Sequence, residues 1–446
     1  MHILLSLFDI LMLGRGSMSR RMSSLLIVLI LVLPGCLGTE RITDEETQSQ
    51  EQEVIDTIEN ETGIEDEILE IANSEFCDET NQLHCMLPFP SGAFLREDSS
   101  EITGYSLNID GEAIPDTSSA ESGNMVILDR LDGFSPSTQI FTAFESTPDI
   151  SDMSDQFDIS PSIEEGHSSI LLNMDTGEKV HHWIELDARA QEGEPTILFL
   201  RTIEGLDHDA AYAVAFRNLV DEEGVPIAPS DGFRALRDSI NTSSEGIEEQ
   251  RSDYEVLFEK LEDSGFIRDG LQAAWWFHTA STESILEDLL IMRDDAELRL
   301  GESGIGCTVT EVQEDYAQDG TSLRLIRGTV TTPHYMEEQY ARSPLMRDSA
   351  GDPEFVQNRE IEFTMLIPKS LAENNESGPL TVFGHGLFGD GDSYVINGRE
   401  LANEYKTVVI ATDFKGWSSD GDYDALTFAL VDITEFQYQQ ERQMQA

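Results

Sequence analysis

The residues best suited to chemistry lie in the stretch GHGLFG, which runs from Gly384 to Gly389. It follows PLTVF, an apolar run typical of a buried strand, and precedes SYVINGRELANEY, which is typical of a helix. Glycine permits sharp turns, so backbone N–H groups after such a strand can face a common point. Donors aimed at a point where negative charge develops stabilise an oxyanion. The stretch therefore predicts an oxyanion-binding turn at the carboxyl end of a strand.

At these residues the sequence resembles the α/β-hydrolase family, specifically lipases and esterases whose third strand ends in His-Gly. The resemblance implies that the N–H of Leu387 donates to the oxyanion, while His385 and Gly386 shape the turn. The resemblance covers the chain from about Cys77 to the end. Over this length the order of the segments resembles that of large exported lipoproteins that join a β-rich domain to an α/β-hydrolase domain. It implies an ester or lipid substrate, with no metal and no other cofactor.

The nucleophile of that family is absent from the sequence. These enzymes carry Gly-x-Ser-x-Gly on a strand-to-helix turn, followed along the chain by an acid and a histidine. The closest strings are GESGI (301–305) and GWSSD (416–420), each without the last glycine. Ser418 has no histidine downstream, because His385 is the last one in the sequence, so Ser418 is not expected to be catalytic. We expect the chain to be C-terminally incomplete and inactive as given.

The N-terminus has the composition of an export signal. Arg20 and Arg21 precede the apolar run LLIVLILVL (25–33), and a Pro-Gly pair then precedes Cys36. This combination resembles a lipoprotein signal, in which Cys36 is lipidated and anchors the chain to a membrane. Simple secretion and an uncleaved anchor are the alternatives. Each of them places the body of the protein outside the cytoplasm.

Three of the four cysteines follow this segment. In an exported protein, Cys77 and Cys85 are expected to form a disulfide that closes a small loop. Zinc bound by these cysteines and His84 is the alternative, although a fourth ligand is not evident. Cys307 is expected to be a buried thiol, because no basic residue lies near it in sequence to lower its pKa.

Other metal-ligating residues give weaker patterns. His181 and His182 are adjacent on an expected strand, so one side chain should point inward and the other outward. Alternating aspartates at 390 and 392, and at 420, 422 and 424, leave calcium open as an alternative. Short aspartate clusters are also expected by chance in so acidic a chain.

The elements that position these residues divide into several regions. Residues 1–36 are expected to be the signal with its lipidated cysteine, and residues 37–76 an acidic, solvated tether. Residues 77–245 contain short apolar runs separated by turns, which predict an antiparallel β-sandwich. The stretch from Leu200 to Leu236 resembles bacterial Ig-like modules, with a turn at Asp221 and Gly224. Residues 246–300 predict a helical connection around the aromatic strand LQAAWWFHTAS, whose Trp275 and Trp276 are expected to be packing anchors.

Residues 301–446 alternate between strand and helix patterns, which predicts a partial α/β-hydrolase-type sheet with helices. TSLRLIRGTVTTP and REIEFTMLIP are expected to form an antiparallel pair, and KTVVIATDF a later strand with an unpaired edge. The fold class predicted for the whole chain is therefore α+β and multidomain.

The charge of the chain limits its partners. Of its 446 residues, 87 are Asp or Glu and 27 are Lys or Arg, giving a formal net charge of −60. Such a surface repels nucleic acid and suits saline surroundings, where salt screens self-repulsion. An ordinary acidic secreted protein is the alternative. Two functions remain: a lipid-anchored hydrolase at the cell surface, and a surface binding or adhesion lipoprotein that uses its Ig-like region.

Overall fold

The computed structural model describes a mixed α+β fold over the greater part of the chain. The described residues are 68–74, 76–110, 113, 128–191, 194–338, 343–373, 377–386, 388–414 and 418. All of the described residues belong to one compact unit, Glu67–Ala446. The predicted signal, Cys36 and most of the predicted tether therefore lie outside the described residues. Among the residues that the structure describes, no helix combines the length and apolar character needed to cross a bilayer.

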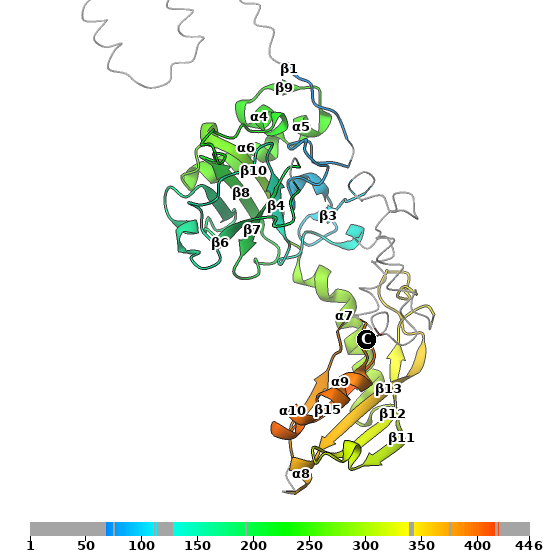
Figure 1. Ribbon diagram of the computed structural model, residues 1–446. Coiled ribbons are helices and arrows are strands. Elements are labelled where there is room, and N and C mark those ends of the chain that lie inside the picture. Colours follow the sequence, from blue (N-terminus) through cyan, green and yellow to red (C-terminus); the bar gives the residue numbers. More distant parts are fainter. Residues whose placement is uncertain are drawn as a thin grey trace, which may run out of the picture. The chain divides into compact units, whose positions relative to one another are not determined.

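The first lobe contains two three-stranded antiparallel sheets that share one core (Figure 1). One sheet has the order β10-β8-β5, and the other has the order β4-β7-β6. Their bounds are β4 (Ile140–Ala143), β5 (Ser169–Asn173), β6 (His182–Leu186), β7 (Ile197–Thr202), β8 (Ala211–Arg217) and β10 (Leu271–His278). Side chains from both sheets meet in the core, among them Ile140, Leu200, Val214 and Phe277. The predicted antiparallel strands of this region are confirmed.

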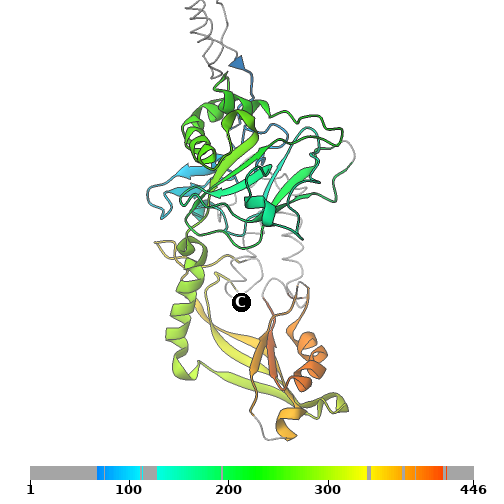
Figure 2. The same cartoon turned by 90° about the vertical axis from the view of Figure 1, so that its left-hand side faces the viewer.

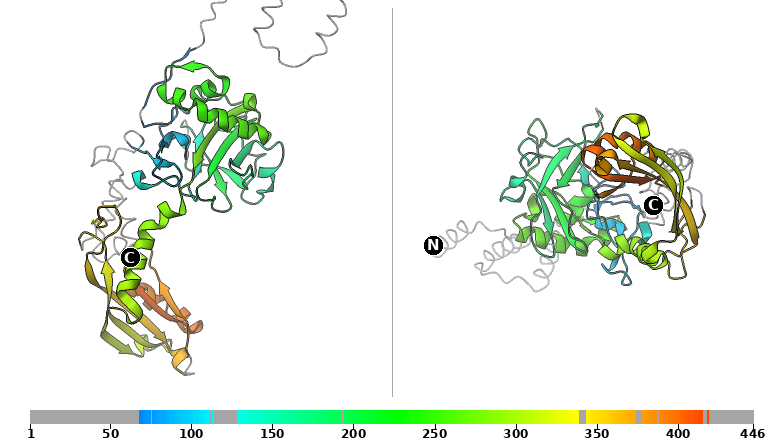
Figure 3. Two further views of the ribbon diagram at one scale, coloured as in Figure 1. Left: turned by 180° about the vertical axis from the view of Figure 1, so that it is seen from behind. Right: turned by 90° about the horizontal axis from the view of Figure 1, so that it is seen from below.

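Helices form a further layer on the sheet that contains β8. They are α4 (Asp231–Asp238), α5 (Glu245–Glu249) and α6 (Arg251–Asp263), and Figure 3 shows them gathered on one side of the strands. Ala213 and Ala215 of β8 face the helical core, while Tyr212, Val214 and Phe216 face the other sheet. Because β8 is covered on both faces, its sequence AYAVAFR is a continuous apolar run and not an alternating one.

Two other predictions for this lobe are confirmed. Trp275 and Trp276 are 1% and 8% exposed and belong to the cores on opposite faces of β10, so they are packing anchors. Gly224 has φ of +78°, and its N–H donates to Asp221 O at 2.9 Å, which is the predicted turn. Small pairs of strands complete the lobe: β1 (Ile68–Leu69) with β9 (Asn241–Thr242), and β2 (Leu95–Glu97) with β3 (Tyr105–Leu107).

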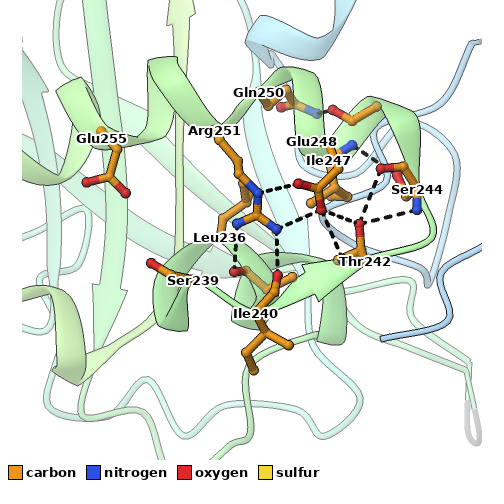
Figure 4. Close-up of polar contacts among 12 residues, drawn as sticks. Leu236, Ser239, Ile240, Thr242, Ser244, Ile247, Glu248, Gln250, Arg251 and Glu255 are labelled. Atoms are coloured by element: carbon orange, nitrogen blue, oxygen red, sulfur yellow. Dashed lines mark hydrogen bonds and ion pairs between the residues drawn. The ribbon is translucent and has the colours of Figure 1, made fainter. Parts of the chain in front are cut away.

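Charged side chains connect the elements of the helical layer to one another, as Figure 4 shows. Arg251, at the start of α6, donates to Glu248 at 2.6 Å and also to the carbonyl oxygens of Ala235 and Ile240. Thr242 of β9 donates to the same carboxylate at 2.8 Å. The Arg251 guanidinium lowers the pKa of Glu248 to about 2. The network links α4, β9 and α6. Because β9 pairs with β1, the end of the predicted tether is part of the folded lobe.

Helix α7 (Thr282–Leu300) leads to the second lobe, a five-stranded sheet. Its order is β11-β12-β13-β15-β14, with β11 (Cys307–Glu314), β12 (Ser322–His334), β13 (Gln357–Pro368), β14 (Leu380–Phe383) and β15 (Val408–Thr412). The predicted antiparallel pair is confirmed as β12 and β13. β15 is antiparallel to β13 and parallel to β14. Short helices accompany the sheet: α8 (Lys369–Glu373), α9 (Gly391–Asn397) and α10 (Arg399–Glu404), with α9 and α10 on one face (Figure 2).

The structure corrects two expectations about this sheet. The last four residues of PLTVF form a strand, β14 (Leu380–Phe383). All four are exposed, and β14 is an edge strand. KTVVIATDF forms β15, which is not an edge: it is paired on both sides, by β13 and β14. The apolar composition predicted both strands correctly, while the order of the strands decided which one is exposed.

Candidate functional site

The candidate site is the corner after β14, and His385 is its central side chain. His385 is 4% exposed. Its Nε2 accepts a hydrogen bond from the N–H of Phe414 at 2.8 Å, and its Nδ1 lies 2.8 Å from Gly386 O. Accepting at Nε2 requires the proton to be on Nδ1, which then donates to Gly386 O. The histidine thus joins the chain after β14 to the chain after β15.

Both ring nitrogens of His385 are therefore occupied by backbone groups. A general base needs a ring nitrogen that can accept a proton from a nucleophile. Nε2 has no such capacity while it accepts the N–H of Phe414. In this arrangement His385 shapes the turn and does not act as a base.

The turn itself is compact. The N–H of Gly389 donates to Gly386 O at 2.9 Å, and Phe388 has φ of +59°. A Cβ on Gly384 would come within 2.6 Å of the Phe414 ring, so only glycine fits there without a shift. Gly386 is exposed. Leu387, the N–H donor that the resemblance implies, lies outside the described residues.

Helix α9 begins directly after the turn. Asp390 caps it by accepting from the N–H of Ser393 at 2.7 Å. The N–H of Gly391 donates to Asp413 Oδ1, also at 2.7 Å, which forms a second link to the end of β15. The corner is thus held to β15 on both sides, through Phe414 and through Asp413.

A pocket of about 500 Å³ lies beside this corner. Residues of β12, β13, the end of β15 and the start of α9 line it, but His385 and Gly386 do not. Among the described residues that line it, the one cation is Arg327, which donates to Asp392 at 2.6 Å and to Glu311 at 2.7 Å. The Arg327 guanidinium holds the pKa of Asp392 below its usual range. Asp390 and Asp392 thus have structural partners: a helix N-terminus and a guanidinium.

Ser418 lies near the corner. It is 2% exposed, and its N–H donates to Phe414 O at 3.1 Å. The atom of His385 that would have to accept its proton is already used by the N–H of the same Phe414. The geometry thus gives no support for a catalytic Ser418, in agreement with the sequence.

The other predicted residues lie elsewhere. Cys77 and Cys85 are joined by a disulfide with an S–S distance of 2.00 Å, and the Nδ1 of His84 accepts from the N–H of Met86. Cys307 was expected to be buried, but it is exposed on the edge strand β11. The described residues include no group of three or more His, Cys, Asp or Glu side chains able to hold a metal ion.

Sequence reasoning missed one serine–histidine pair. Ser169 Oγ lies 2.8 Å from His182 Nε2, and His182 Nδ1 lies 2.8 Å from Val180 O. This resembles a nucleophile with its base, but both residues are 0% exposed, so no substrate reaches them. Burial lowers the pKa of His182 to about 4 and keeps it neutral. His182 is the inward-pointing member of its pair, as predicted, and His181 is half-buried.

Comparison with known proteins does not add to these observations. No family model, no curated protein and no solved structure matches the chain. The function must therefore be inferred from the residues and from their arrangement.

Proposed function

We propose that the second lobe is the oxyanion half of an ester hydrolase of the α/β-hydrolase type. The observation that carries the proposal is the link between His385 and Phe414, which fixes a His-Gly turn at the shared carboxyl end of two parallel strands. In the family that the sequence resembles, the oxyanion hole takes one N–H from the turn between the third strand and the following helix. β14 is the third strand after β11, and α9 comes directly after it.

The edge of the sheet also supports the proposal. Parallel strands are usually covered on both faces, yet Leu380 and Val382 of β14 are 58% and 77% exposed. Edge strands that are not meant to pair usually carry charges or bulges. β11, at the opposite edge, has both: Glu311 and Glu314, and a register shift next to Val309. β14 has neither and accommodates a further strand, whose carboxyl end would lie next to Gly386.

The chemistry of this site is acyl transfer. A serine hydroxyl at the end of the added strand would attack the ester carbonyl, and the N–H groups of the turn would stabilise the oxyanion that forms. His385 contributes by holding the turn in place. The 446 residues contain no Gly-x-Ser-x-Gly, so we expect them to have no esterase activity by themselves.

Lipid anchoring through Cys36 belongs to the same proposal. The acidic residues after Cys36 would separate the folded lobes from the membrane surface, and two packed antiparallel sheets suit an Ig-like origin of the first lobe. Metabolic labelling with an alkyne fatty acid tests the anchor. Label that is retained in a Cys36→Ser variant would contradict it.

The hydrolase proposal is tested by reading the gene past the codon for Ala446 and expressing the extended reading frame. We expect a Gly-x-Ser-x-Gly within roughly the next hundred residues, with an acid and a histidine beyond it. The extended protein should hydrolyse p-nitrophenyl esters and react with a fluorophosphonate probe, and the 446-residue form should do neither. A stop codon directly after Ala446 would overturn the proposal and favour a surface binding protein.

A further inference from the structure

Asn241 is the first residue of a short motif in the first lobe, away from the corner. Residues 241–243 read Asn-Thr-Ser, which is the Asn-x-Ser/Thr pattern of N-glycosylation acceptors, with a residue other than proline in the middle. So short a motif also occurs by chance, and it indicates a glycan only where the asparagine lies on the surface of an exported protein. Two further copies begin at Asn60 and Asn375, which lie outside the described residues.

The side chain of Asn241 meets this condition of exposure. Asn241 is the first residue of β9, shortly after the end of α4, and it pairs with Ile68 of β1. It is exposed, and in the described part of the chain its side-chain amide has no hydrogen-bond partner. The amide can therefore carry a covalent group without losing a contact. A sugar on it would lie beside Ile68, a large apolar side chain that is 58% exposed.

The serine of the motif, in contrast, is bonded to the chain that follows β1. Ser243 Oγ accepts the N–H of Ile71 at 3.0 Å and donates to Ile71 O at 3.1 Å. The motif requires a hydroxyl at this position, and in the folded lobe that hydroxyl is already used as donor and as acceptor. The sugar must therefore be added before residues 68–71 dock against β9. Once added, it projects from an exposed position and leaves the pairing of β1 with β9 intact.

We propose that Asn241 carries an N-linked oligosaccharide, added before β1 pairs with β9. In the transfer, Asn241 Nδ2 forms a bond to C1 of the first sugar of a lipid-linked oligosaccharide phosphate. The bond between C1 and the phosphate oxygen breaks, the lipid phosphate leaves with the electron pair of that bond, and the amide releases one proton. The proposal rests on the export that the N-terminal segment predicts, and it is independent of the esterase chemistry.

The test is peptide mass spectrometry on the protein purified from the membrane fraction of its own cells. We expect the peptide that contains Asn241 to be heavier than its sequence by a whole number of sugar residues. Asn241→Gln, made in the same cells, should lose the added mass and still fold, because the amide has no partner. Ser243→Ala should also lose it, whereas Ser243→Thr should keep it, because threonine satisfies the motif as well.

The matched control is Asn358, an exposed asparagine whose second following residue is a glutamate, so that it begins no such motif. Its peptide should have the mass of its sequence. An unmodified Asn241 in protein from the membrane fraction would overturn the proposal and leave export intact. Added mass on Asn241 and Asn358 alike, or on Asn241 in Ser243→Ala, would show modification without regard to the motif and would also overturn it.

If Ser243→Ala does not accumulate, Asn241→Gln and Ser243→Thr decide. Recovery of the protein from the cytoplasm alone would contradict export, and the glycan would be rejected with it.

Discussion

The N–H of Phe414 donates to His385 Nε2 at 2.8 Å, and through this bond the ends of β14 and β15 form a single corner. The two rings lie 5.1 Å apart, centroid to centroid, so the contact includes packing as well as a hydrogen bond. A histidine that could be mistaken for a catalytic base is thus a structural residue of the turn.

Replacing this histidine should lower the stability of the second lobe. His385→Ala leaves the N–H of Phe414 without its acceptor in a largely buried place, and we expect a loss of about 1–3 kcal/mol. Urea denaturation followed by circular dichroism measures it. His208→Ala is the matched control, because His208 is exposed, and it should change the free energy of unfolding by less than about 0.5 kcal/mol. Equal effects of the two changes would rule out the structural role of His385.

A methyl group at position 384 should also destabilise the corner. In Gly384→Ala the Cβ would lie 2.6 Å from the Phe414 ring, which is itself held by His385. Overpacking of this kind costs about 1–3 kcal/mol. Gly270→Ala is the control, since nothing lies within 4 Å of its Cβ position. If Gly384→Ala unfolds at the same urea concentration as the wild type, the ring is free to move and the corner is not tightly fixed.

The strands of the second lobe could be predicted from the sequence because each of them is a local run rich in apolar residues. It did not predict which residues are exposed. Cysteine and valine are usually buried, yet Cys307 and Val382 are exposed because they lie on the edge strands β11 and β14. Which strands lie at the edges depends on the order of the whole sheet. Strand order arises from pairings between distant segments, which no local pattern contains.

The candidate site was predictable to a similar extent. The glycines and His385 indicated a turn after a strand, and the turn is there. The partner of His385 could not be foreseen, because Phe414 lies 29 residues further along and contributes its backbone, not its side chain. Ser169 and His182 were missed for the same reason: they come from two strands of different sheets and meet only in the folded core.

His182 should contribute an acid-dependent loss of stability to the first lobe. Its pKa is lowered from 6.5 to about 4 by burial, and the groups that face it are Ser169, Val180 O and the rings of His167 and His181. At this residue the unfolded chain therefore binds a proton that the folded chain does not, so the contribution of His182 to stability falls as the pH drops from 6.5 to 4. The loss should be roughly 3 kcal/mol. His182→Asn should remove this contribution, so its stability relative to the wild type should increase as the pH falls from 6.5 to 4 in a denaturation series. The exposed His208→Asn should follow the wild type, and a His182→Asn profile parallel to that of the wild type would assign the effect elsewhere.

Asp78 should act in the opposite direction in the same lobe. Asp78 is 1% exposed and accepts hydrogen bonds from Thr80 and Ser91, with Glu79 and Tyr254 nearby.

Burial raises the pKa of Asp78 from 3.8 to about 6, so the folded state holds its proton more tightly than the unfolded state. The stability that this contributes is fully present below pH 3.8 and is lost as the pH rises through 6, by roughly 3 kcal/mol. Asp78→Asn should remove this contribution and leave the slope due to His182 visible, so stability would fall more steeply between pH 6 and pH 4 than in the wild type. Asp269→Asn, at an exposed position, is the control. Because the two groups oppose one another, the wild type should show a flat profile in this range, and a steep wild-type profile that neither variant alters would contradict both assignments.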